Sequence, residues 1–187
     1  MEASERTRRW FVMSAIGEDR PGIVADLAEL IYDCDGNLED SRMARLGSEF
    51  AVLLLASGQG ADLEQRLAAG CKRLEWEKRL TVFLRRVEGP PLAASPERQL
   101  VCTVTGIDKA GIVARVARTI ASHGLSVRDL RSDVRYASNA GTPIYTLRLA
   151  IAAPADFAVE ALRTDLEQVA MDLGLELSLD EIGTDDP

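Results

Sequence analysis

One turn in the sequence has residues that could hold both ends of a free amino acid. Asp19 and Gly22 lie between an apolar run at 10–16 and an apolar pattern of helical spacing that begins near Pro21. A helix N-terminus offers unpaired backbone N–H groups and a positive dipole, which suit a carboxylate. An aspartate ahead of that helix could accept a hydrogen bond from an ammonium group. The alternative is that the aspartate simply caps its own helix, and residue chemistry alone favours this alternative.

The same turn occurs a second time. Residues 17–25 read GEDRPGIVA and residues 106–114 read GIDKAGIVA, an offset of 89 between positions 17 and 106. Asp108 and Gly111 therefore occupy the places of the aspartate and glycine of the first turn. The chain is expected to be one unit built twice.

Other reactive side chains are few. The single histidine, His123, ends an apolar helical pattern, and a capping or surface role is expected because the pattern places no nucleophile or carboxylate beside it. Cys34, Cys71 and Cys102 lie in helix or strand patterns, where a buried, inert thiol is expected. Neither a disulfide framework nor a metal-ligand set is visible. We expect no catalytic residue, no metal and no cofactor.

Charge and hydropathy exclude further classes. The 22 Lys and Arg against 30 Asp and Glu give a net charge of −8, which repels phosphate backbones, so direct nucleic-acid binding is not expected. The longest apolar run, residues 50–56, is far too short to span a bilayer. No separable signal core follows the N-terminus, and the cysteine usage fits a reducing compartment. A cytoplasmic protein without membrane association is expected.

The elements that must position the two turns follow the order βαββαβ in each copy. In the first copy we expect a helix starting at Pro21 or Gly22 and ending at Gly36, a second helix at 61–77, and strands at 10–16, 37–46, 49–57 and 79–87. In the second copy we expect helices at 110–123 and 155–173, and strands at 100–105, 125–136, 143–152 and 175–182.

This order predicts an α+β protein with two ferredoxin-like domains, each an antiparallel four-stranded sheet with both helices on one face. We place the domains at 8–88 and 98–183, with a Pro-rich linker at 89–97. The offset between the copies grows to 95 in their second halves, which indicates a six-residue insertion at 137–142. Both faces of the first strand are apolar, so the two units are expected to associate.

The motif resembles the ACT domain. The resemblance rests on Gly-x-Asp-Arg-Pro-Gly-Ile-Val at 17–24 and Gly-Asn-Leu-x-Asp at 36–40, which the second copy matches in part. The tandem pair with a long second hairpin is similar to the glycine cleavage system transcriptional repressor group. The resemblance implies a regulatory module that binds a small ligand, often an amino acid, between two domains. It also implies a regulated protein partner and a place in transcriptional control of amino-acid metabolism.

The resemblance further implies which residues bind the ligand. The turn of one domain and the start of the second strand of a neighbouring domain share it. In copy one these positions are Asp19, Arg20, Pro21, Gly22, Ile23, Asn37 and Leu38. In copy two they are Asp108, Lys109, Gly111, Ile112, Ser126 and Val127. Because Ser126 has fewer hydrogen-bonding atoms than Asn37, we expect the site with Asn37 to be the better amino-acid binder.

Three alternatives stay open. An acylphosphatase-type enzyme would use an arginine in the turn and an asparagine on a strand, for which Arg20 and Asn37 are available. An RNA-recognition sheet would need exposed aromatics, and Phe50 and Tyr145 lie on comparable strands, although core packing explains them better. An interaction module without a ligand is the third. We expect a non-enzymatic regulator that forms a homodimer.

Overall fold

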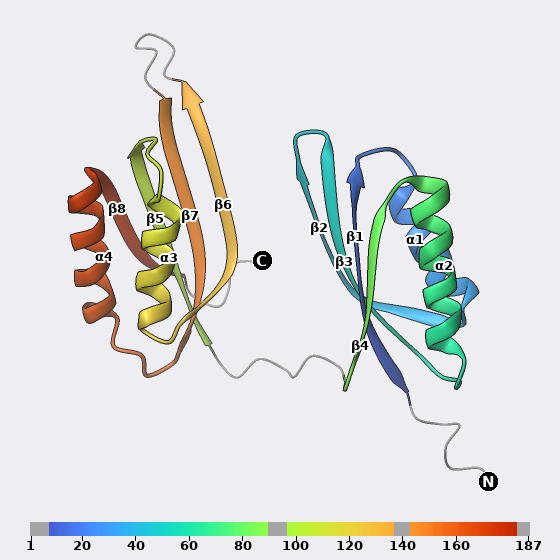
Figure 1. The fold of residues 1–187 in the computed structure, drawn as a ribbon. Coiled ribbons are helices and arrows are strands. Elements are labelled where there is room, and N and C mark those ends of the chain that lie inside the picture. The colour runs from blue at the N-terminus through green and yellow to red at the C-terminus, as the bar shows by residue number, and fades with distance from the viewer. Residues whose placement is uncertain (1–7, 90–96, 137–142, 183–187) are drawn as a thin grey trace. The chain divides into compact units, whose positions relative to one another are not determined.

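A computed structural model describes residues 8–89, 97–136 and 143–182 of the protein. Its strands and helices follow the expected order βαββαβ twice. The chain divides into unit 1, Met1–Leu92, and unit 2, Ala93–Pro187 (Figure 1). Unit 1 contains β1 (Arg9–Glu18), α1 (Ile23–Asp33), β2 (Gly36–Leu46), β3 (Glu49–Gly58), α2 (Leu63–Lys78) and β4 (Thr81–Val87). Unit 2 contains β5 (Glu97–Ile107), α3 (Ile112–Ser122), β6 (Ser126–Tyr136), β7 (Pro143–Pro154), α4 (Val159–Leu173) and β8 (Leu175–Ile182). The predicted insertion at 137–142 and most of the predicted linker lie outside the described residues.

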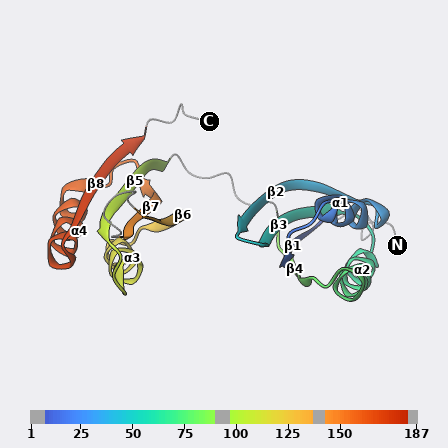
Figure 2. The ribbon, with the colours of Figure 1, turned by 90° about the horizontal axis from the view of Figure 1, so that it is seen from above.

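Each unit is one antiparallel sheet covered by two helices. The strand orders are β2-β3-β1-β4 and β6-β7-β5-β8, and every neighbouring pair is antiparallel. Within each unit both helices lie on the same face of the sheet (Figures 1 and 2). The predicted pair of ferredoxin-like βαββαβ units is confirmed.

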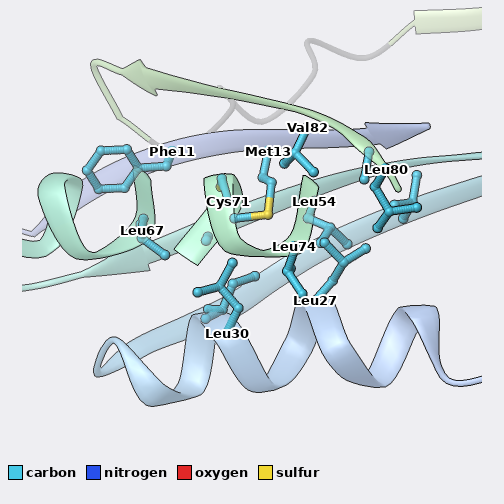
Figure 3. Close-up of a cluster of buried hydrophobic side chains, with 14 of the residues drawn as sticks. Phe11, Met13, Leu27, Leu30, Leu54, Leu67, Cys71, Leu74, Leu80 and Val82 are labelled. Carbon is cyan, nitrogen blue, oxygen red and sulfur yellow. The ribbon is translucent and has the colours of Figure 1, made fainter. Parts of the chain in front are cut away.

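The core of unit 1 lies between its sheet and its helices. Phe11, Met13 and Ala15 are fully buried on β1, because alternate residues of a strand point to the same face. They meet the apolar faces of α1 and α2, where Leu27 and Leu67 are among the fully buried side chains (Figure 3). The inward face of α2 is formed by four buried residues at helical spacing: Leu63, Leu67, Cys71 and Leu74.

The repeat extends to the register of the strands. β1 pairs Gly17 with Phe50, and β5 pairs Gly106 with Tyr145, so the offsets of 89 and 95 hold in space. Both second strands carry an irregularity at the same place, between Leu38 and Asp40 in β2 and between Val127 and Asp129 in β6. Phe50 is buried and Tyr145 packs against the second core, so the aromatic pair belongs to the interior as predicted.

The end of α1 differs from the prediction. Gly36 does not cap the helix with a positive φ: Cys34 is the C-cap, and Asp35 takes the left-handed conformation at φ 54°. Gly36 instead begins β2 against the helix. A Cβ there would lie 2.9 Å from the carbonyl oxygen of Ile31, so the requirement for glycine is steric.

Candidate ligand-binding site

The first turn leaves the N-terminus of α1 without a side-chain cap. The helix begins at Ile23, and Gly22 is its N-cap in a left-handed conformation at φ 95°. Pro21 therefore precedes the helix, and the expectation that it occupies the first helical turn was wrong. No side chain caps the helix, so the alternative in which Asp19 caps α1 was also wrong. The first-turn N–H groups of α1 remain available to an anionic group.

The second turn repeats this geometry. Gly111 is the N-cap of α3 at φ 93°, and no side chain caps that helix. A Cβ on Gly22 or Gly111 would meet no atom within 4 Å, so both glycines border open space. The two copies of the turn, which contain Asp19 and Asp108, therefore both lead into a helix N-terminus that no side chain caps.

The two aspartates of the turns differ in their partners. The Asp19 carboxylate is 3.1 Å from Nη1 of Arg45, and its backbone N–H donates to the Ser48 carbonyl at 2.7 Å. The register puts Val134 of unit 2 in the place of Arg45. Within the described ranges, the Asp108 side chain has no hydrogen bond or ion pair. One turn therefore carries a neutralised carboxylate and the other a free one.

Arg20 and Lys109 contact the second helix of their own unit. Arg20 Nη2 donates to the carbonyl oxygen of Lys78 at 2.9 Å, and Lys109 Nζ donates to that of Leu173 at 2.6 Å. These oxygens lie at the C-terminal ends of α2 and α4, where unpaired carbonyls attract cations. Both cations bind the ends of helices, a role that the sequence did not indicate.

Asn37 and Leu38 lie at the opposite end of unit 1 from Asp19. Arg45, near the C-terminal end of β2, forms the ion pair with Asp19. Asn37 lies eight residues before Arg45 on the same strand, which is about 26 Å at a rise of about 3.3 Å per residue. Ser126 likewise begins β6. Each unit therefore separates its turn from the start of its second strand. The pairing of Arg20 with Asn37 that an acylphosphatase would need is absent from unit 1.

Asn37 belongs to a polar cluster that the sequence did not predict. Its Nδ2 donates to Oε1 of Glu39 at 2.9 Å, and Oγ of the buried Ser57 donates to the same oxygen at 2.5 Å. Arg8 forms an ion pair with Glu39. Hydrogen bonds from Asn37 and Ser57 lower the pKa of the Glu39 carboxyl. Unit 2 cannot build this cluster, because Ala152 stands opposite Ser126 where Ser57 stands opposite Asn37.

An apolar pocket of about 250 Å³ lies beside β2, between α1 and the sheet. Leu38 and Met43 of the edge strand form one wall, and Val24 forms part of the helix wall. The lining residues are Val24, Leu27, Ala28, Leu38, Ser41, Met43, Val52 and Leu54. Among the predicted site residues, Leu38 lines this pocket. Its neighbour Asn37 instead hydrogen-bonds to Glu39 in the polar cluster.

The remaining reactive side chains have structural positions. Cys34, Cys71 and Cys102 are buried and unpaired, as predicted. His123 is the C-cap of α3, as the expected capping role requires, but a carboxylate does lie beside it, because its Nε2 is 2.9 Å from an oxygen of Asp165 on α4. That contact links the C-cap of α3 to the second helix of the unit. Among the described residues no cluster of three or more histidine, cysteine or acidic residues could hold a metal ion.

None of the described helices has both the length and the apolar composition that a membrane span requires.

Comparison with known proteins agrees with the repeated architecture. The family profile of the ACT domain matches twice, over residues 9–84 and 98–180. The glycine cleavage system transcriptional repressor of Escherichia coli (strain K12) is 29% identical over 136 residues, covering 71% of this chain and 69% of the relative.

Two solved structures share the architecture over most of the chain. A protein of unknown function from Galdieria sulphuraria has a TM-score of 0.80 and 28% identity, and the match covers 95% of this chain and 100% of that one. A structure provisionally assigned as a glycine cleavage system transcriptional repressor has a TM-score of 0.72 and 21% identity, with 95% and 99% coverage. At that identity the second structure shows the fold alone. The chain belongs to the ACT domain family and consists of two ACT domains in tandem.

Proposed function

We propose that this protein is a non-enzymatic regulator that binds an amino acid and thereby modulates a protein partner in transcriptional control. The observation that carries the proposal is the pair of uncapped helix N-termini at Gly22 and Gly111, each bordered by open space. Backbone N–H groups in this position bind carboxylates. The resemblance to a named transcriptional repressor supports the regulatory role.

The preferred site combines the second turn with the second strand of unit 1. The Asp108 carboxylate is free to accept an ammonium group, and the N–H groups after Gly111 receive the carboxylate of the ligand. Asn37 and Leu38 of a neighbouring unit 1, in the same chain or in a second one, complete the site. The converse site, with Asp19 and Ser126, is weaker because Arg45 already neutralises Asp19.

Regulation then operates by a shift in population. A ligand that touches two units stabilises the arrangement in which both of its contacts are made, and the shift is limited by its differential affinity for the two arrangements. A net charge of −8 disfavours direct contact with DNA, so the regulated partner is a protein. We propose a homodimer as the working form.

Isothermal titration of the full chain against the twenty amino acids tests this function. Asp108→Asn and Asn37→Ala should each weaken the measured affinity by about tenfold or more, since a hydrogen bond to a charged group contributes about 1.5–3 kcal/mol. Asp19→Asn and Ser126→Ala are the matched controls and should change it by less than about threefold. Absence of binding at millimolar concentration would favour an interaction module without a ligand.

A further inference from the structure

Unit 1 exposes an apolar surface on the face of its sheet that the helices leave uncovered. We call this surface the bare face; its apolar side chains include Val12, Ile16, Leu53, Leu55 and Phe83. Leu53 is 50% exposed, Ile16 48% and Phe83 62%, on three different strands. Directly opposed residues of antiparallel strands share a face, so Val12 lies beside Leu55, and Leu53 and Phe83 flank Ser14 on the same face. Patches of this kind mark sites of association.

Three of these five positions are polar in unit 2, while Val101 and Ala150 in the places of Val12 and Leu55 are apolar. Arg148 of β7 stands where Leu53 stands, and Ser178 of β8 stands where Phe83 stands. Thr105 takes the place of Ile16. Unit 2 thus lacks the three exposed apolar side chains that unit 1 carries on this face.

The bare face of unit 1 carries a negative charge at one edge of the sheet and a positive charge at the other edge. One row across the sheet reads Asp40, Leu55, Val12 and Arg85, from the β2 edge to the β4 edge. A negative and a positive residue thus sit at opposite ends of the same row. Within the described ranges neither charge has an ion-pair partner.

We propose that the bare face of unit 1 packs against the same face of a second copy of this chain. The two-fold axis runs parallel to the strands, between β3 and β1. This rotation exchanges the sheet edges and keeps the rows, so Asp40 faces Arg85 of the partner subunit. Leu55 faces Val12 of the partner subunit, and the helices remain outside. Sheets stacked face to face pack about 10 Å apart with strands aligned within about 30°.

The same operation excludes the bare face of unit 2 as the partner surface. The corresponding row there reads Asp129, Ala150, Val101 and Asp180, so a two-fold pairing would oppose two carboxylates. In a mixed pair of faces the same operation would set Arg148, which lies on an inner strand, opposite Ser14 in a row that holds no carboxylate, which is costly. The second copy of unit 1 is the occupant that covers the apolar patch, opposes Asp40 to Arg85 of the partner subunit, and leaves Arg42 on the edge strand at the rim.

This interface rests on the proposed homodimer and gives it a contact surface. The ligand titration described above tests the regulatory function separately.

Sedimentation equilibrium of the full chain should show a dimer. Leu53→Arg/Phe83→Ser places on unit 1 the residues that unit 2 carries, at exposed positions. It should weaken the dimer by about a hundredfold or more, because interface truncations at buried anchors cost about 2 kcal/mol each or more. Arg148→Ser is the control and should leave the dissociation constant unchanged. A monomeric wild type, or a double variant that dimerises as the wild type does, would overturn the proposal.

A charge exchange tests the orientation of the two faces. Asp40→Arg and Arg85→Asp should each weaken dimerisation by about tenfold, since each opposes like charges at two symmetric places. The double variant Asp40→Arg/Arg85→Asp restores opposite charges and should return the dissociation constant to within about threefold of wild type. Circular dichroism of each variant verifies folding. A double variant as weak as the two single ones would refute the two-fold pairing.

Discussion

Gly22 and Gly111 give both turns their shape. Each holds a left-handed backbone at the start of a helix, a conformation that costs other residues about 1–2 kcal/mol. Each also leaves the space beside the helix open. The partners around the glycines differ: Arg45 forms an ion pair with Asp19, whereas Val134 takes the place of Arg45 in unit 2 and Asp108 has no such partner among the residues that the structure describes. At the scale of residues, the two copies share the backbone of a binding site and differ in its charge.

Cys102 supplies a pH test of the core. It is completely buried in β5, and burial raises the pKa of its thiol from 9.0 to about 12. The unfolded chain then loses this proton at lower pH than the folded chain, so the contribution is present below about pH 9 and is lost as pH rises toward 12. The free energy of unfolding in urea should fall between pH 9 and 11 by about 2 kcal/mol more in wild type than in Cys102→Ala. Equal pH dependence of the two proteins would contradict this assignment.

Sequence reasoning located both turns but not the partners of their charged residues. Arg20 and Lys109 were expected at the ligand, yet each hydrogen-bonds a helix C-terminus in its own unit. The sequence separates Arg20 from Lys78 by 58 positions, and no local pattern indicates that pairing. The carboxylate of Asp165 beside His123 was missed for the same reason.

At the scale of elements, the order of strands and helices was easier to predict than their ends, and β5 extends to 97–107 where 100–105 was expected. The expected strand at 175–182 and the start of the strand at 143 agree with β8 and β7 because apolar alternation and turn residues mark them. The helices begin later than expected, since a positive-φ glycine rather than Pro21 starts α1. Local composition does not distinguish these two ways of entering a helix.

Gly70 lets α1 and α2 approach closely. A Cβ at this position would lie 1.9 Å from Cδ1 of Leu30, which faces it from α1. Alanine inside a helix ordinarily stabilises by about 1 kcal/mol relative to glycine, but here overpacking should make Gly70→Ala destabilising by about 1–3 kcal/mol. Urea unfolding measures this difference.

A double-mutant cycle identifies the cause. In a Leu30→Ala background the obstruction is gone, so Gly70→Ala should become neutral or stabilising. If the single variant Gly70→Ala proved more stable than wild type, the close packing of the two helices would be contradicted.

At the scale of the whole chain, two units of one fold carry unlike surfaces. Unit 1 has the polar cluster of Asn37, the apolar pocket beside β2 and an apolar bare face. Unit 2 has Asp108, which forms no ion pair within the described residues, and a bare face with Thr105, Arg148 and Ser178 in place of exposed apolar side chains. The sequence predicted that the copies differ at Asn37 and Ser126, but the bare faces emerge only once strand register assigns each residue to a side.

The most direct test of the binding role is an NMR titration of the ¹⁵N-labelled full chain with each of the twenty amino acids. An amino acid that binds should shift the amide resonances of Ile112–Ala114 together with that of Asn37, and the resonances of Ile23–Ala25 more weakly. These amides lie at the uncapped starts of α3 and α1 and at the start of β2. Shifts confined to other parts of the chain, with the first-turn amides unmoved, would contradict a ligand-binding role for the repeated turn.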